Sequence, residues 1–460
     1  MQIKHCTIPP KIGILLVINI FIVSRNTIKK DMEFKMKSTK VKYNFGNQGT
    51  FMIVYSAVLV YFMTGLTVDG LNIIVPGFAA LKGWDANQLL SIATPASVAA
   101  LILTSFWSIV IRKWGLKLST TIALFAAAVS IILFAQSVNI LMYGITETLM
   151  ITFINCFSVI GGYAMIANWF PKKKGIVLGF TTMGMNVASA TIPALLTAFS
   201  KIFDPNGNIT HALYIFASIL FLVGIFNQLL IKASPEDAGC FPDNEREELG
   251  HVDLPEGTPG SKERMNYLQA LLNPRIWLLG LAYGLTGMGT VGIMSQMIPY
   301  LSSNRGFTIQ AALMTMSVAA LIGVLGSYLW GIVDQKWGTK FATQIYGIWY
   351  AAAIAMLIAP GGQMTLYLGI VMIGLGIGGN ANFAPSMTTL CYGRSDFATA
   401  FSLVNMIHGV IRSAAFLVLG LVRGATGSTE TAYLIFIVMS VLGTVVISFV
   451  NVKHVKNVEA

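Results

Sequence analysis

The chain has 460 residues, of which 55% are hydrophobic and 11% are charged, with a mean hydropathy of +0.71 and a formal net charge of +11. A soluble chain carries roughly a quarter charged residues, so this composition excludes a soluble protein. The apolar residues fall in separate runs, each long enough to cross a hydrocarbon core of about 30 Å as a helix, whereas strands of a membrane β-barrel would read as shorter alternating segments. We therefore expect an all-α integral membrane protein.

Residues 1–45 are predicted to form a cytoplasmic N-terminal tail. Its apolar run, residues 12–23, is shorter than the roughly 20 residues that a membrane span needs, and no small-residue cleavage site follows it. We expect a dispensable or interfacial tail. The alternative is a gene model extended upstream of a true start at Met32 or Met36.

Twelve spans are predicted after this tail. Six lie near residues 51–78, 88–111, 118–136, 141–167, 176–200 and 211–231, and six near 277–300, 308–333, 341–360, 364–390, 397–422 and 431–451. The polar segment 232–274, rich in charge, Pro and Gly, divides them into six and six and is expected to be a solvated cytoplasmic linker. The chain thus divides into an N-terminal half (46–231), this linker, a C-terminal half (275–452) and a cytoplasmic tail (453–460).

The basic residues predict the orientation in the membrane. Short loops rich in Lys and Arg stay in the cytoplasm. A cytoplasmic N-terminus leaves only four basic residues on the opposite face, namely Lys82, Lys201, Arg305 and Arg423. Both termini are then cytoplasmic and the chain is a multi-pass protein of the cell membrane. The positive charge reflects topology and attraction to anionic lipid, so nucleic acid is not an expected partner.

No constellation for catalysis or metal binding is found in the sequence. The cysteines, Cys6, Cys156, Cys240 and Cys391, offer neither a disulfide framework nor metal-ligand spacing. Motifs such as H-E-x-x-H or G-x-S-x-G are missing, and so is a Walker-type ATP site. We therefore expect neither an enzyme nor a cofactor.

Two loops of the chain are near-copies of each other. Residues 107–117, WSIVIRKWGLK, align with residues 330–340, WGIVDQKWGTK, at an offset of 223 residues, with seven of eleven positions identical. Each loop follows the second span of its half. This repeat predicts two six-helix units of one ancestral fold, related by an axis along the membrane normal.

The second loop resembles the G-x-x-x-D-x-x-G-x-K/R signature of the major facilitator superfamily, with the gating candidates Gly331, Asp334, Gly338 and Lys340 in place. The resemblance extends over about residues 46–452 and implies the twelve-helix fold of these transporters. In that family the acid of this loop is a latch that meets the start of a helix in the opposite half. Asp334 is therefore expected to face the start of the fifth span, near Gly175.

The first loop departs from the signature. Ser108 and Ile111 replace the glycine and the acid. The N-terminal latch is therefore expected to be weaker and to rest on packing and on two further gating candidates, Arg112 and Lys113.

Three other segments resemble the organic-anion and monocarboxylate branches of this superfamily, including the oxalate/formate antiporter group. They are NWFPKKKG (168–175), YGRSDF (392–397) and PEDAGCFPD (235–243). Carriers of these branches usually bring an Arg from span eight, but residues 308–333 contain no basic residue. A site with one cation, suited to a monocarboxylate, is therefore expected.

Ionisable residues inside the spans are candidates for function, because a charge near the bilayer centre costs at least roughly 2.5–3.5 kcal/mol. Arg412 in span eleven can hold a carboxylate with its planar fork, or it can tie helices together through backbone carbonyls or Asp69. His408 and Asn405 lie on or near the same helix face. Asp69 and Glu147 are candidate proton carriers or static members of ion pairs.

Neutral polar side chains could complete the pocket, although hydrogen bonds between helices explain such residues equally well. The main candidates are Tyr283, Asn155 and Asn380, with Tyr163, Asn186, Gln296 and Asn382 as further ones.

The sequence therefore predicts a secondary transporter of a small organic solute, of the monocarboxylate type, which works by alternating access with proton coupling or anion exchange. We expect it to function as a monomer in the bilayer, with its solute and protons as partners. The alternative is a proton-coupled exporter of drugs or of neutral or lipophilic solutes, which the 22 Met and 27 Phe residues would suit.

Overall fold

The computed structural model describes residues 44–245 and 265–451, and these residues belong to one compact unit. They form helices and turns, with no strand among them. Residues 1–43 of the predicted N-terminal tail, with the alternative start sites, lie outside the described residues, as do the predicted tail 453–460 and the middle of the linker.

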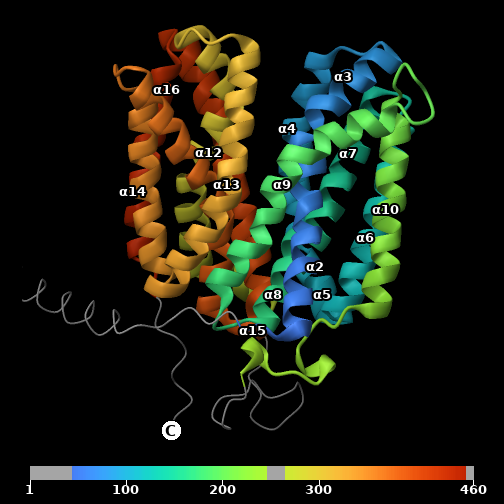
Figure 1. The fold of residues 1–460 in the computed structure, drawn as a ribbon. Helices are drawn as coiled ribbons and strands as arrows, with labels where there is room; N and C mark the ends of the chain where they lie inside the picture. Colours follow the sequence, from blue (N-terminus) through green and yellow to red (C-terminus); the bar gives the residue numbers. More distant parts are fainter. Residues whose placement is uncertain (1–43, 246–264, 452–460) are drawn as a thin grey trace, which may run out of the picture. The chain divides into compact units, whose positions relative to one another are not determined.

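The first half contains six spans (Figure 1). The first is α2 (Gly46–Thr64), a π-helical segment η1 (Gly65–Asp69) and α3 (Leu71–Lys82), and the second is α4 (Ala86–Ser105) with α5 (Trp107–Trp114). The third is α6 (Leu116–Ala135), and the fourth is α7 (Ile140–Asn155), the π-helical segment η2 (Cys156–Gly162) and α8 (Tyr163–Trp169). The fifth and sixth are α9 (Lys174–Ser200) and α10 (Ile209–Leu230).

The described part of the linker forms two 3-10 turns, η3 (Glu236–Ala238) and η4 (Pro242–Asn244), and one short helix, α11 (Tyr267–Leu271). The second half follows with α12 (Pro274–Asn304), α13 (Ile309–Trp337), α14 (Thr339–Ile358), α15 (Gln363–Thr426) and α16 (Thr429–Ser448).

Twelve spans result from these helices. Eleven segments of the described residues are long and apolar enough to cross a membrane. One of them lies in α15, whose 64 residues are interrupted at Gly393 with φ of 69°. Since a span needs only about 20 residues, α15 provides two spans, the tenth and the eleventh. The predicted all-α fold with twelve membrane helices in two halves is confirmed.

The two copies of the repeated loop adopt the same backbone. Gly115 has φ 80° and ψ 162°, and Gly338 has φ 84° and ψ 148°. Each glycine N–H donates to the carbonyl oxygen four residues earlier, at 2.8 Å for Ile111 and 2.9 Å for Asp334. A positive φ favours glycine, which explains why both copies keep it.

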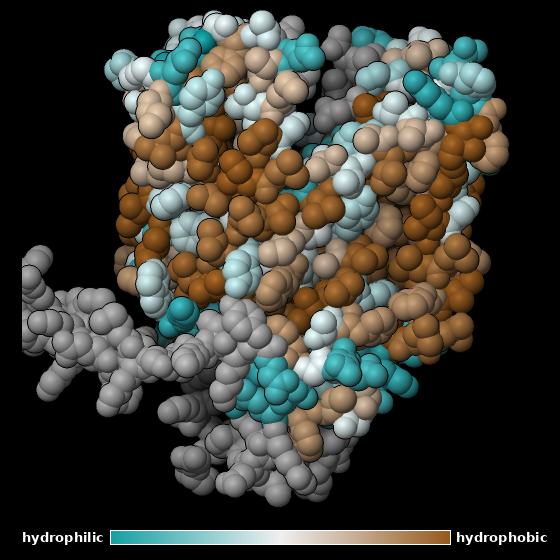
Figure 2. Space-filling view, in the orientation of Figure 1, coloured by the Kyte–Doolittle hydropathy of each residue, from teal (hydrophilic) through white to brown (hydrophobic). Residues whose placement is uncertain are grey.

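The helix surfaces carry large exposed apolar side chains, for example Leu222 (64% exposed), Leu325 (62%) and Leu417 (63%). Figure 2 shows that apolar residues cover the helices between two ends where hydrophilic residues gather. Such a surface is unfavourable in water and suits lipid. The chain is therefore a multi-pass membrane protein.

Candidate functional site

The two halves are joined at one end of the bundle. We call it the basic end, and it carries the loops 112–117, 170–175, 336–340 and 392–396 with linker residues 231–245. Here α9 of the first half packs on α13 of the second. A Cβ on Gly331 would lie 2.8 Å from the carbonyl oxygen of Gly175, and a Cβ on Gly179 would lie 2.8 Å from that of Ser327. Only glycines allow the two backbones to come this close.

Asp334 lies at this contact, against the start of α9, where the sequence predicts it. Its side chain is 2% exposed, and Thr339 Oγ1 donates to its Oδ1 at 2.6 Å. Helix α9 has no side-chain cap at its start, so its first N–H groups give that end a partial positive charge. Lys174 adds a full charge that interacts with Asp334.

The other predicted gating residues differ in their surroundings. Gly331 belongs to the close contact and Gly338 to the turn after α13. Lys340 donates instead to the carbonyl oxygens of Ser448 (2.7 Å) and Val450 (3.0 Å) in its own half. Arg112 and Lys113 are exposed, and neither makes a hydrogen bond or ion pair with a described residue. Their gating role stays a prediction.

Buried hydrogen bonds also connect the two halves, in addition to the close contact at Gly179 and Gly331. Asn186 of α9 donates to Ser327 Oγ (2.9 Å) and to the carbonyl oxygen of Gly323 (3.2 Å) in α13. Thr182 of α9 donates to Asn382 of α15, which in turn donates to the carbonyl oxygen of Ser327 at 2.8 Å. These amides join helices, so they are not free to line a pocket.

Linker residues 231–245, which we call the strap, fold onto the first half. The Asp243 carboxylate accepts hydrogen bonds from the backbone N–H groups of Lys172 (3.0 Å) and Lys173 (2.8 Å). Lys173 Nζ donates to the carbonyl oxygens of Asp243 (2.6 Å) and Asn44 (3.0 Å), and lies 3.2 Å from Glu245 Oε1. Burial raises the pKa of Asp243, and the two N–H donors offset part of that rise. The start of the linker is therefore packed against the helices at Asp243, whereas Glu236, Asp237 and Phe241 are exposed.

One ion pair joins the strap to the second half. Arg394 donates to both carboxylate oxygens of Glu236, at 2.8 and 2.9 Å. Burial by itself would raise the pKa of Glu236, but the hydrogen bonds from Arg394 lower it overall. Trp169 Nε1 donates to the carbonyl oxygen of Lys232 at 3.0 Å. Of the three segments that resemble the anion-carrier branches, 235–243 belongs to the strap. The other two, 168–175 and 392–397, both form hydrogen bonds with the strap.

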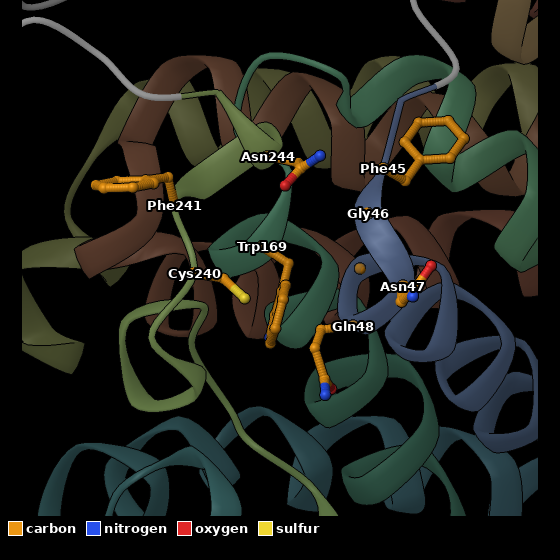
Figure 3. Close-up of a pocket in the computed structure, with 9 residues that line it drawn as sticks. Phe45, Gly46, Asn47, Gln48, Trp169, Cys240, Phe241 and Asn244 are labelled. Carbon is orange, nitrogen blue, oxygen red and sulfur yellow. The ribbon is translucent and has the colours of Figure 1, made fainter.

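A small pocket of about 150 Å³ lies between the strap, the start of α2 and the end of α8. Figure 3 shows its lining, including Phe45, Trp169, Cys240, Phe241 and Asn244. No Lys, Arg, Asp or Glu lines it. The pocket is therefore a poor site for an organic anion.

Arg412 lies where three helices from both halves come together. Its aliphatic stem crosses Gly287 of α12, on which a Cβ would lie 3.3 Å from Arg412 Cδ and 3.1 Å from His408 Nε2. His408 is 7% exposed, and its Nε2 has no hydrogen-bond partner among the described residues. From the first half, the Tyr163 hydroxyl of α8 interacts electrostatically with Arg412. The predicted pair of Arg412 and His408 is thus close together at the joint between the halves.

Arg412 makes no hydrogen bond or ion pair with any residue that the structure describes. Among the described residues, Arg412 is therefore not hydrogen-bonded to Asp69 or to a backbone carbonyl, and its role in solute binding stays a prediction. Asp69 ends the π-helical segment η1, and its side chain interacts with Ser189 of α9.

Glu147 is 0% exposed, and both of its carboxyl oxygens lack a hydrogen-bond partner within the described ranges. It lies near Tyr143 of the same helix. The structure therefore does not bring either acid to Arg412.

The remaining predicted pocket residues are not brought together. Tyr283 is 2% exposed, and its hydroxyl lies 3.3 Å from Thr343 Oγ1 in the neighbouring α14. Asn155 is buried, while Asn380 and Asn405 are half-buried. These three make no hydrogen bond through their side chains with a described residue. Tyr163, one of the further candidates from the sequence, packs on α15 of the second half, a position that the sequence could not predict because it depends on how the halves pack.

No group of three or more His, Cys, Asp or Glu side chains that could hold a metal ion occurs in the described part of the chain. Cys156, Cys240 and Cys391 are free thiols.

Comparison with known proteins places the chain in a family. The model of the Major Facilitator Superfamily matches residues 57–416. A curated relative, the "Uncharacterized MFS-type transporter YhjX" of Escherichia coli (strain K12), is 19% identical over 278 residues, which are 58% of this chain. The match spans 64% of that relative's length.

Solved structures share the fold. The E. coli fucose:proton symporter FucP has a TM-score of 0.62 and 15% identity, covering 87% of this chain and 99% of its own. The proton:xylose symporter XylE has a TM-score of 0.64 and 12% identity, covering 87% and 95%. The human organic anion transporter MFSD10 has a TM-score of 0.60 and 15% identity, covering 86% and 97%.

At these identities the likeness to solved structures shows the fold alone. The family model, however, covers most of the chain, and the twelve spans in two halves agree with it. The chain belongs to the major facilitator superfamily and is a secondary transporter rather than an enzyme.

Proposed function

We propose that this transporter carries a small monocarboxylate-type anion and that Arg412 holds the carboxylate. Transport takes place by alternating access, in which the two halves move about a site near the middle of the membrane. Proton coupling or exchange of one anion for another drives it. The protein works as a monomer, with its solute and protons as partners.

The observation that carries this proposal is the missing counter-ion of Arg412. A guanidinium stays charged at all relevant pH values, and an unpaired charge within a span is costly. Arg412 has no partner among the described residues, although it is at the joint between the halves. A carboxylate would supply the missing charge, and the planar fork can hold both of its oxygens.

The number of cations favours one carboxylate over two. Helix α13 contains no Lys or Arg before Lys336, which lies in its last turn at the basic end. A dicarboxylate would need a second cation near the first. The proteins that share this fold include two sugar:proton symporters and an organic anion transporter by name, so they do not decide the class of solute, whereas the unpaired charge of Arg412 favours an anion.

The orientation follows from the basic loops, which favour a cytoplasmic position for the basic end and for both termini of a cell-membrane protein. The contacts of Asp334, the buried amides and the strap then close the cytoplasmic side. This arrangement supports a latch role for Asp334. With the cytoplasmic side closed, the structure corresponds to the conformation in which the transporter binds solute from outside the cell.

A thermal-shift titration of the purified protein in detergent tests the proposal, because a ligand that binds the native state raises its apparent stability. We expect acetate, propionate, lactate or benzoate to raise the midpoint of wild type and of the control Lys201→Gln, an exposed cation at the end of α9. Arg412→Gln should abolish the shift, and Arg412→Lys should weaken it. An undiminished carboxylate shift in Arg412→Gln, or shifts only with neutral or cationic compounds, would contradict the proposal.

A further inference from the structure

We infer that the Tyr163 hydroxyl is the second donor to the carboxylate that Arg412 holds, so that the bound anion links the two halves. The inference rests on the proposed function and assigns a role to a residue of the other half. Tyr163 belongs to α8, whereas Arg412 belongs to α15.

Packing fixes the position of the Tyr163 ring. The side chain is 4% exposed, and its ring centroid lies 5.6 Å from that of Phe401 in an edge-to-face contact. Phe401 lies on α15, so the ring is held between the halves. Tyr163 follows directly after the π-helical segment η2, and such segments shift the side chains beyond them around the helix. The phenol is therefore held rigidly beside the helix that carries Arg412.

The hydroxyl is poorly satisfied within the protein. Its hydrogen bond goes to Met185 Sδ at 3.6 Å, and a thioether sulfur is a weak acceptor. A carboxylate oxygen is a far better acceptor, and a hydrogen bond to an ionised group is roughly twice as strong as a neutral one. An incoming anion would therefore draw the hydroxyl proton away from Met185.

The hydroxyl and the guanidinium both lie at the joint between the halves, since the Tyr163 ring packs on Phe401 and Arg412 lies about three helical turns further along α15. They interact electrostatically but make no hydrogen bond with each other. A carboxylate between them can accept from both at once. His408 Nε2 is buried and has no hydrogen-bond partner in the described part of the chain. A Cβ on Gly287 would contact both His408 Nε2 and the Arg412 stem, so these two side chains lie on the same face of α15, toward Gly287.

The consequence concerns the coupling between binding and movement. A ligand that contacts Tyr163 in one half and Arg412 in the other is bound tightly only when the halves are at the right separation. Its binding energy therefore selects among conformations, which is what alternating access requires. Arg412 provides the charge, and Tyr163 makes the affinity depend on the position of the first half.

Tyr163→Phe tests the inference, since it removes the hydroxyl and keeps the ring on Phe401. The matched control is Tyr350→Phe, a buried phenol of α14 that packs on Tyr346 at a centroid distance of 5.7 Å. Acetate, propionate and benzoate are titrated by calorimetry or thermal shift. Loss of one hydrogen bond to a charged group predicts roughly ten-fold or greater weakening in Tyr163→Phe, and none in Tyr350→Phe. The unliganded melting midpoint should stay near that of wild type.

The outcomes separate the two proposals. Unchanged carboxylate affinity in Tyr163→Phe, with binding abolished in Arg412→Gln, would overturn the role of Tyr163 and leave the proposed function intact. Failure of wild type to bind any carboxylate would overturn both. Should Tyr163→Phe not fold, Met185→Leu serves instead. It removes the sulfur acceptor and frees the hydroxyl, so carboxylate binding should become as tight as in wild type or tighter, and a loss of affinity would contradict the inference.

Discussion

The Asp334 carboxyl group lies directly against Gly175, so that a Cβ on this glycine would be 3.0 Å from Asp334 Cγ and 2.8 Å from the backbone nitrogen of Gln335. Gly175 is the second residue of α9 in the first half, and Asp334 lies near the end of α13 in the second. The glycine therefore lets an acid reach the positively polarised start of a helix across the joint. We expect closure of the basic end to depend on this pair.

Gly175→Ala should weaken that closure. The added methyl group would push α13 away from α9, and overpacking of this kind typically costs about 1–3 kcal/mol. The half-buried Cys391, close enough to Lys174 to interact with it, provides a reporter at the joint. In a chain whose other cysteines are replaced by alanine, we expect Gly175→Ala to speed the reaction of Cys391 with a thiol reagent.

The control is Gly362→Ala, because nothing lies within 4 Å of a Cβ at that position and its φ is not positive. Its labelling rate should equal that of the parent chain. Equal rates in Gly175→Ala and Gly362→Ala would show that the Asp334 contact does not hold the basic end closed.

The ion pair between Glu236 and Arg394 predicts a dependence of closure on pH. The pKa of Glu236 is lower in the folded protein, so the pair contributes stability above the ordinary glutamate pKa of about 4.3. That contribution is lost as the pH falls through the folded value. Because Glu236 is half-exposed, the pair is worth about 0.2–1 kcal/mol and should weaken in high salt.

Glu236→Gln should therefore lower the melting midpoint slightly and speed Cys391 labelling at pH 7, and both differences from wild type should shrink as the pH falls below the ordinary glutamate pKa of about 4.3. Asp237→Asn changes an exposed acid in the same turn and should have no effect at pH 7 or below it. A difference between Glu236→Gln and wild type that persists unchanged at low pH would rule out this ion pair as its cause.

The parts of the structure that the sequence predicts well are local or repeated. Span ends agree because polar caps mark them, as Asn139, Asn208 and Ser428 do by accepting hydrogen bonds from the first turns of α7, α10 and α16. The position of Asp334 follows from the repeated loop and the family signature. Each of these signals is contained within a few residues.

The contacts that the sequence misses join segments far apart in the chain. Nothing in the linker marks Asp243 as the partner of Lys173, or Glu236 as the partner of Arg394, because such pairing depends on how the halves pack. Lys340, a signature residue expected at the latch, makes its hydrogen bonds to the end of α16 instead, and its gating role stays a prediction. Arg412 stands out in the sequence because it is charged, but Gly287 and Tyr163 beside it do not.

Gly287→Ala should damage the anion site more than the fold. A methyl group there would crowd the Arg412 stem at 3.3 Å and His408 Nε2 at 3.1 Å, which would shift the guanidinium. Gly289→Ala on the same helix is a matched control, because its methyl group would meet Ile354 and Ser440 at a similar 3.3 Å but away from Arg412. Loss of one charged hydrogen bond predicts roughly ten-fold weaker carboxylate binding for Gly287→Ala, with similar melting midpoints for both variants. Equal affinity in the two variants would contradict the placement of the site on Gly287.

Glu147→Gln should separate proton coupling from solute binding. Glu147 is fully buried and its oxygens have no hydrogen-bond partner within the described residues, so an ionised carboxyl group would be costly there. In proteoliposomes, uptake of a carboxylate driven by a pH gradient should be lost in Glu147→Gln, while exchange of labelled for unlabelled carboxylate continues.

Glu430→Gln is the control for Glu147→Gln, because Glu430 begins α16 at the end of the bundle away from the basic end and its side chain is 43% exposed. It should keep both activities. Loss of exchange together with gradient-driven uptake in Glu147→Gln would instead place Glu147 in the fold or in solute binding. Full proton dependence in that variant would leave Asp69, in its π-helical turn beside Ser189, as the carboxyl group that carries the proton.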